Sequence, residues 1–261
     1  ALDDPIKRAT AIELAERSTK CYFAGFTEDG MSLEGAGYWS YGFGQYLRLG
    51  LMASRATDGR VDFFSSPRVK ACVRSGFDTY YNDNGAPAYG DCKIDLNCEI
   101  TWYLAGLVWP EFATEKTNRA AESSWSLPLA MIRLFPVGGH APDTIRASRI
   151  YPIRSWYPDV VQQLVCRPQP EKADSKSLYA SFRGGCNDTK KIGHNHNDVG
   201  TFGLAIDGCE IVGDPGIKEY DLKTFGPHRY ESNLRNSYGH PVPLVDGQMQ
   251  LVGKLGAKLL G

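Results

Sequence analysis

Apolar positions in the first half of the chain follow a helical rhythm. From residue 5 to about 135 they mostly recur three and four residues apart, beginning with Ile6, Ala9 and Ile12. This spacing is typical of the buried face of a helix. Pro67 stands where a first helical turn accommodates proline. The pattern predicts helices from residue 5 onward and over 38–55, 67–80, 100–107 and 127–134.

From about residue 145 the apolar positions form short extended runs instead. Asp207-Gly208 separates two of these runs and is a strong hairpin signal, because a tight hairpin turn requires positive φ angles. Strand following strand through short turns favours an antiparallel sheet or sandwich. We therefore expect an α+β chain with a helical domain over 1–140, a sheet domain over 141–261 and a boundary near 136–147. The predicted strands cover 149–157, 160–166, 178–183, 199–206 and 209–212.

Composition and charge exclude several classes of protein. The formal net charge of the 261 residues is −1, so no global basic field would bind nucleic acid or an anionic membrane. No run of 18 apolar residues predicts a membrane span. The chain opens on Ala1 without a visible secretory signal, and we treat it as a segment of a longer protein. The seven cysteines leave at least one free thiol, and a Cys92–Cys98 pair stays open.

Three of the five histidines, His194, His196 and His240, stand with acids at spacings that suit a metal. If the segment is extended, His194, His196 and Asp198 share one face. Asp214 follows the next strand, and His240 comes later. Two imidazoles and a carboxylate suit Zn²⁺. The alternative is a set of histidines that bond a core loop without metal, and Asp198 could either orient a ring or cap a turn.

Two further stretches have a composition that suits carbohydrate chemistry. Residues 34–46 combine four glycines with five aromatics at a helix start. They could form a platform for sugar rings, or only a tightly packed helix start. In residues 227–233, Arg229 could clamp a carboxylate through two hydrogen bonds. Tyr230 could give or take a proton. The alternative is an ordinary surface loop.

Taken together, these stretches resemble the heparinase II/III-like family of polysaccharide lyases. The resemblance rests on residues 193–202, 214–216, 229–230 and 236–240, and residues 34–42 are similar to the helical domain of that family. It spans about 30 to 250. It implies an incomplete α/α toroid followed by an antiparallel β-sandwich. It also implies β-elimination on a uronic-acid-containing polysaccharide, with proton transfer by a tyrosine and a histidine.

The resemblance also divides the histidine cluster by role. His196, Asp214 and His240 correspond to the ligands of a structural Zn²⁺, and His194 corresponds to the histidine that faces the substrate. Tyr38 or Tyr41 corresponds to the catalytic tyrosine, and both could face the cleft because they lie about one helical turn apart. Further residues are expected to act on the substrate: Tyr230 in proton transfer, and Glu34, Trp39 and Arg229 in binding.

The same resemblance sets the expected surroundings and the alternatives. It implies an acidic polysaccharide as partner, a periplasmic or secreted location and, as in many relatives, a homodimer. The family usually carries a histidine earlier in the toroid, but this chain has none before His140, and Pro241 stands where many lyases have Asn. A catalytically incomplete carbohydrate-binding homologue therefore stays open. So does a zinc-dependent glycan hydrolase, in which metal-bound water would be the nucleophile.

Overall fold

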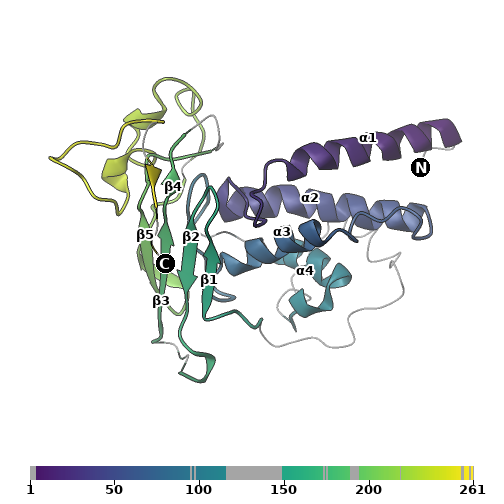
Figure 1. The fold of residues 1–261 in the computed structure, drawn as a ribbon, viewed down its shortest axis with the longest axis horizontal. Coiled ribbons are helices and arrows are strands. Elements are labelled where there is room, and N and C mark those ends of the chain that lie inside the picture. The colour runs from purple at the N-terminus through teal and green to yellow at the C-terminus, as the bar shows by residue number, and fades with distance from the viewer. Residues whose placement is uncertain are drawn as a thin grey trace.

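The chain folds into a helical region followed by a sheet region (Figure 1). This computed structural model describes residues 4–94, 96, 98–115, 149–172, 174, 176–188, 194–217, 219–253, 256–258 and 260. The predicted boundary near 136–147 and the predicted helix over 127–134 lie outside the described residues. The mixture of helices and antiparallel strands agrees with the predicted α+β class.

Four α-helices lie in the described part of the helical region, and each lies where the apolar rhythm predicted one. They are α1 (Pro5–Phe23), α2 (Gly35–Ala56), α3 (Pro67–Asp78) and α4 (Glu99–Val108). The Asp4 carboxylate caps α1 by accepting from the amides of Ile6 and Lys7, and prolines begin α1 and α3. In Figure 1, α1 runs along α2, and α3 and α4 lie on the other side of α2. None of the described helices combines the length and apolar character that a membrane span requires.

Aromatic rings fill the core between α2, α3 and α4. Trp39 stacks on Phe43 and meets Phe77 edge-on, and Phe77 stacks on Trp102. A Cβ at Gly76 would lie 1.9 Å from Cε2 of Trp39, so only glycine lets α3 approach α2 this closely. The helical region therefore has its own tightly packed core.

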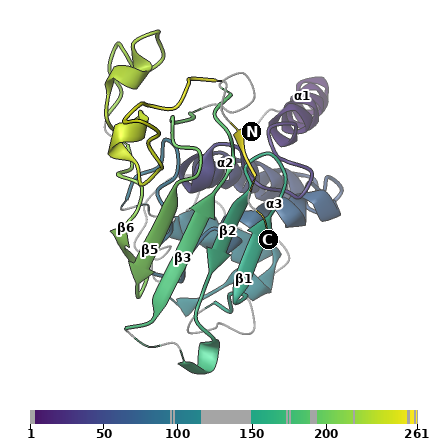
Figure 2. The ribbon, with the colours of Figure 1, turned by 60° about the vertical axis from the view of Figure 1, so that its left-hand side comes forward.

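Five antiparallel strands form one sheet in the order β1-β2-β3-β5-β6. They are β1 (Arg154–Tyr157), β2 (Gln163–Cys166), β3 (Leu178–Arg183), β5 (Phe202–Ile206) and β6 (Cys209–Val212). A short pair joins β4 (Gly185–Cys186) to β7 (Gly256–Ala257). Figure 2 shows the five strands side by side in front of the helices. Within the described residues the main sheet is a single layer, so the second layer of the sandwich and the closure of the toroid stay predictions.

The predicted hairpin joins β5 to β6. Asp207 and Gly208 have φ angles of 50° and 83°, and Ile206 pairs with Cys209. Positive φ at both turn residues matches the right-handed twist of the two strands. The hairpin prediction is confirmed, and it fixes where the chain leaves β6 toward Asp214.

The loop that follows α3 connects the helical region to the inner face of the sheet. The buried Arg167 guanidinium donates to the backbone carbonyls of Asp78, Tyr80 and Tyr81. The Tyr81 hydroxyl donates to Oε1 of Glu210, on β6, at 2.8 Å. Because buried polar groups must be paired, these bonds hold the loop in one position. The chain then continues from this loop toward residues 89–92, which lie beside the candidate site.

All seven cysteines are free thiols. Cys92 and Cys98, the pair that the sequence left open, are both buried and are not joined. Burial raises the pKa of the Cys92 thiol to about 12 and that of Cys98 to about 11. These two thiols are therefore core side chains that stay protonated near neutral pH.

Candidate functional site

The segment that carries His194 and His196 is a loop rather than a strand. His194 has a φ of 54°, and β5 begins only at Phe202. The loop is fastened to the segment around 235–237, because the Asn197 amide donates to the Arg235 carbonyl at 2.8 Å. Ser237 also donates through Oγ to the Asn197 carbonyl at 2.7 Å. The expectation of an extended segment with its alternating faces is therefore wrong, since the left-handed turn at His194 breaks the alternation.

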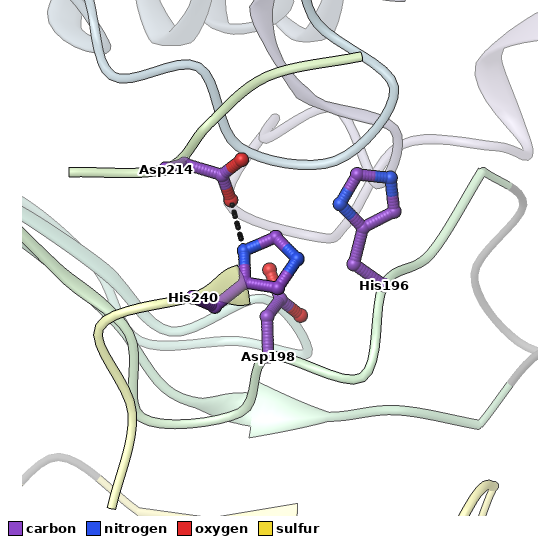
Figure 3. Close-up of side chains that lie close together, drawn as sticks. All are labelled: His196, Asp198, Asp214 and His240. Atoms are coloured by element: carbon purple, nitrogen blue, oxygen red, sulfur yellow. Dashed lines mark ion pairs between the residues drawn. The ribbon is translucent and has the colours of Figure 1, made fainter. Parts of the chain in front are cut away.

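Four side chains converge behind this loop, as Figure 3 shows: His196, Asp198, Asp214 and His240. We call them the metal group. One donor atom from each lies within 4.8 Å of the others, and Nδ1 of His240 is 3.1 Å from Oδ2 of Asp214. The three predicted ligands are therefore brought together, although His196 and His240 are separated by more than 40 residues of chain.

The donor atoms of the metal group are buried and lack hydrogen-bond partners. His196 is 0% exposed and His240 6%. His196 Nδ1, both ring nitrogens of His240 and Oδ2 of each aspartate make no hydrogen bond, although Nδ1 of His240 and the two Oδ2 atoms are in ion pairs. Leaving a buried polar atom without a hydrogen bond costs about 1–3 kcal/mol, so several such atoms close together would be unfavourable without a bound cation. The residues thus fit a metal ion.

Local contacts orient the carboxylates of the metal group. Oδ1 of Asp214 accepts from the Gly216 amide at 2.9 Å, which leaves Oδ2 directed at the group. Asp198 Oδ2 lies 3.6 Å from Nη1 of Arg183, so this carboxylate forms an ion pair with a guanidinium. Burial lowers the pKa of His240, but the adjacent Asp214 carboxylate outweighs burial and raises it. The candidate metal ligands are the three predicted residues, His196, Asp214 and His240. Asp198 offers a fourth donor atom.

On the other side of the loop, His194 belongs to a different set of side chains. Its ring stacks on that of Tyr38, with centroids 3.8 Å apart and planes at 16°. The Tyr38 hydroxyl is hydrogen-bonded to the Tyr220 hydroxyl, and Tyr220 also lies near Nδ1 of His194. We call Tyr38, His194 and Tyr220 the pocket group. Burial, followed by the bond to Tyr38, raises the pKa of Tyr220, so its hydroxyl stays protonated.

Two members of the pocket group, Tyr38 and Tyr220, line a cavity of about 610 Å³. Tyr41 lines the same cavity one helical turn beyond Tyr38 and is 70% exposed. Both candidate tyrosines therefore face the cavity, but Tyr38 is the one that contacts His194. The described lining residues are Gly37, Tyr38, Tyr41, Asp91, Lys93, Leu96, Ile217, Glu219 and Tyr220.

A single carboxylate, Asp91, joins the two groups. Its Oδ2 is 2.9 Å from Nδ1 of His194, and its Oδ1 is 2.9 Å from Nε2 of His196. Arg229 and the Tyr220 hydroxyl also donate to it. Burial alone would raise the pKa of Asp91, but the His196 hydrogen bond and the Arg229 charge outweigh burial and lower it to about 2. The carboxylate is therefore ionised at neutral pH.

Two predicted substrate-binding residues point inward. Trp39 is 1% exposed and donates through Nε1 to the Cys72 carbonyl, so it is a core residue of the helical region. Arg229 begins the short helix η3 (Arg229–Glu231). Its guanidinium donates hydrogen bonds to Asp91 and to the carbonyls of Asn195 and Thr224. Both side chains are therefore held by partners within the protein, and the substrate-binding roles expected of Trp39 and Arg229 stay predictions.

The other two candidates are also displaced from the cavity. The Tyr230 hydroxyl is buried without a hydrogen-bond partner, and burial raises its pKa. A role in proton transfer to a ligand is therefore not supported by its position. Glu34 is the residue before α2, half-buried, and is not among the described residues that line the cavity.

Asp91 and Tyr220 are the functional candidates that sequence reasoning missed. Asp91 lies 103 residues before His194 in a loop without a recognisable motif. Tyr220 follows Asp214 in an irregular segment. The sequence marked Asp214 as a metal ligand and residues 214–216 as part of the resemblance, but it did not mark Tyr220. No local signal predicted either contact, since both depend on how the helical and sheet regions pack together.

Comparisons with known proteins bear on the fold. No family model and no curated protein matches this sequence. Among solved structures, heparan sulfate lyase HepC from Pedobacter heparinus matches with a TM-score of 0.60 and 17% identity, over 96% of this chain and 35% of that one. The heparinase III BT4657 gene product, with methylated lysines, matches with a TM-score of 0.63 and 14% identity, over 95% of this chain and 34% of that one.

These matches agree with the family that the motifs resemble, and they extend over both the helical and the sheet regions. The chain spans about a third of the length of the two lyases. At these identities the likeness concerns the fold alone, so this chain has the fold of about one third of a heparan sulfate lyase or heparinase III.

Proposed function

We propose that this chain belongs to a polysaccharide lyase that cleaves a uronic-acid-containing polysaccharide by β-elimination. The observation that carries the proposal is the stacking of Tyr38 on His194 at the edge of the cavity, with Asp91 behind the histidine. A tyrosine and a histidine in contact can supply the acid and the base that this reaction needs. The fold shared with heparan sulfate lyase HepC supports the same reaction class.

The arrangement suggests how the two protons are handled. With Nδ1–H donated to Asp91, the neutral His194 ring has Nε2 available to accept the C5 proton of the uronate. The electrons of the C5–H bond then form the C4–C5 double bond as the C4–O bond breaks. Tyr38 gives its proton to the leaving oxygen. The products are a new chain end and an unsaturated uronate, and water is not consumed.

The metal group is proposed to hold a structural Zn²⁺ through His196, Asp214 and His240, with Asp198 adjacent. Zinc bound there would supply cross-linking between the loop after His194, the segment after β6 and the segment after η3. A hydrolytic zinc keeps an open position for water, whereas a structural zinc is closed by protein donors. Four buried protein donors in one place favour the closed, structural role over the hydrolase alternative.

Recognition of the substrate carboxylate is assigned to Lys93 rather than Arg229. Lys93 is the cation among the described residues that line the cavity, while Arg229 is held by Asp91. Tyr41, exposed on the same wall, offers a ring face on which a sugar can stack. We expect Lys93→Ala to raise KM for a uronate polymer more than it lowers kcat.

The test is an ultraviolet assay of the protein on heparan sulfate, alginate, hyaluronan and other uronate polymers. We expect absorbance from the C4–C5 double bond to rise on at least one polymer. Tyr38→Phe should abolish that rise, and Tyr41→Phe, on the same wall, is the matched control that should retain turnover. Reducing sugar released without absorbance would instead identify a hydrolase. Polymer binding without either product would identify a carbohydrate-binding homologue and overturn the lyase proposal.

A further inference from the structure

Asp91 is the one described side chain that contacts a histidine on each side of the site. Its side chain is 0% exposed. It reaches His194 and His196 at 2.9 Å through different oxygens. This buried carboxylate accepts hydrogen bonds from two imidazoles, an arginine and a tyrosine. Removing the carboxylate would leave these donors without an acceptor in a buried place, which is costlier than losing an ion pair at the surface.

These contacts dictate which nitrogen of each ring carries hydrogen. An ionised carboxylate only accepts hydrogen bonds, so His194 must carry its hydrogen on Nδ1 and His196 must carry its hydrogen on Nε2. The neutral rings then have their lone pairs on opposite atoms. In His194 the lone pair is on Nε2. In His196 it is on Nδ1, the buried atom without a hydrogen-bond partner in the metal group.

The surroundings of Asp91 hold it in this role. Nη2 of Arg229 lies 3.3 and 3.5 Å from its two oxygens, and the same guanidinium is fixed by the Asn195 carbonyl between the two histidines. Tyr220 donates to Oδ2 at 3.1 Å. The carboxylate is therefore locked by a cation and by the loop that bears both rings.

We propose that Asp91 is a positioning residue that sets the tautomers of both histidines, making Nε2 of His194 the proton acceptor and Nδ1 of His196 the metal donor. Its consequence for turnover rests on the proposed lyase function, whereas its consequence for the two rings does not. Asn at this position would break the arrangement, because its amide has one oxygen to accept and an NH₂ that donates. One of the two rings would have to present a lone pair instead and reverse its tautomer.

The experiment compares Asp91→Asn with Asp78→Asn. Asp78 is a buried carboxylate that pairs with Arg74 and Tyr157 rather than with a histidine. Ring-nitrogen NMR shifts at one neutral pH report the tautomers, and chelator competition reports zinc affinity. For Asp91→Asn we expect a reversed tautomer in at least one ring. Zinc affinity should fall about 10–100-fold, and kcat about 10²–10⁴-fold with little change in KM. Asp78→Asn should leave tautomers, zinc affinity and kcat unchanged.

Three outcomes separate this proposal from the lyase proposal. If the wild-type protein has hydrogen on Nε2 of His194 or on Nδ1 of His196, the positioning role is overturned, and this measurement needs no variant to fold. Unchanged tautomers in folded Asp91→Asn also overturn it. Wild-type tautomers as expected, with no turnover on any uronate polymer, would support the positioning role and contradict the lyase function alone.

Discussion

The pocket group and the metal group begin two residues apart and differ in almost every physical respect. The His194 side chain is 20% exposed and stacks on Tyr38, which lines a cavity. His196 is fully buried among carboxylates and a second histidine. The first environment permits proton exchange with a ligand, while the second permits little except holding an ion. Two histidines that are almost adjacent in sequence are thus placed in two different environments, on either side of the left-handed turn at His194.

The different surroundings of the two groups also predict different effects on stability. Substitutions in the pocket group should be tolerated better than substitutions in the metal group. The pocket group is partly exposed, although it reaches the buried Asp91 through Tyr220 and His194. The metal group brings together buried residues of three chain segments that lie outside the strands of the main sheet. Activity and stability should therefore separate between the two groups.

The largest expected effect is the loss of turnover when His194 is replaced by alanine. Removing the proton acceptor should lower kcat about 10²–10⁴-fold, while the melting temperature should fall less than in His196→Ala, because the hydrogen bond to Asp91 is lost but no metal donor is. Initial rates of absorbance increase and a thermal melt check both halves. Retained turnover in this variant would place the base elsewhere in the protein.

The next effect is destabilisation by His196→Ala. This change removes a metal donor and leaves Asp91 without one of its buried partners. We expect a loss of about 3–5 kcal/mol in the free energy of unfolding, as for other broken buried pairs. Denaturant titration measures it. A chelator should destabilise the wild-type protein and leave His196→Ala unaffected, and equal sensitivity of the two would argue against a metal role for His196.

The carboxylates of Asp91 and Glu210 also differ, because their pKa values are shifted in opposite directions. Asp91, bonded by cationic and imidazole donors, has a lowered pKa, whereas burial raises the pKa of Glu210, which accepts from Tyr81, to about 7. The folded chain therefore keeps a proton on Glu210 that the unfolded chain releases above its usual pKa of 4.5. Stability from this group is present at low pH and is lost as the pH rises from about 4.5 to about 7.

Glu210→Gln should remove that pH dependence. Because glutamine can still accept from Tyr81 and carries no charge to desolvate, the variant should be more stable than wild type above pH 7, by about 1–3 kcal/mol. Denaturant midpoints for both proteins between pH 5 and pH 8 test this. Parallel curves across that range would show that Glu210 ionises normally in the folded protein.

The smallest expected effect is that of Tyr230→Phe. The hydroxyl that is removed is buried without a hydrogen-bond partner, so the free energy of unfolding should change by less than about 1 kcal/mol. Turnover should stay at the wild-type level. A large fall in kcat with unchanged stability would return Tyr230 to the role that its sequence motif suggested.

Much of the local structure could be predicted from the sequence because it depends on local rules. Apolar periodicity located α2, α3 and α4, and positive-φ residues located the turn at Asp207-Gly208. Bounds were less accurate at the starts of two strands. The run from 149 begins as strand only at Arg154, and that from 199 only at Phe202.

The site was predicted less completely, for reasons that differ from residue to residue. The residues of the metal group could be predicted because histidines are rare in this chain and their motif resembles a known family. Trp39 shares its buried face with Ala36, Phe43 and Leu47, which lie at helical spacing from it. That spacing is typical of a core position, and the substrate-binding role expected of Trp39 stays a prediction. Asp91 could not be found, because its partners are brought to it by the packing of the sheet region on the helical region.

The most direct test of the division between the two groups is the zinc content of His194→Ala and His196→Ala, purified in parallel with the wild-type protein. Elemental analysis should find about one zinc per chain in the wild-type protein and in His194→Ala. It should find little in His196→Ala. Zinc lost from His194→Ala and kept in His196→Ala would contradict the account, since the two histidines would then have exchanged roles.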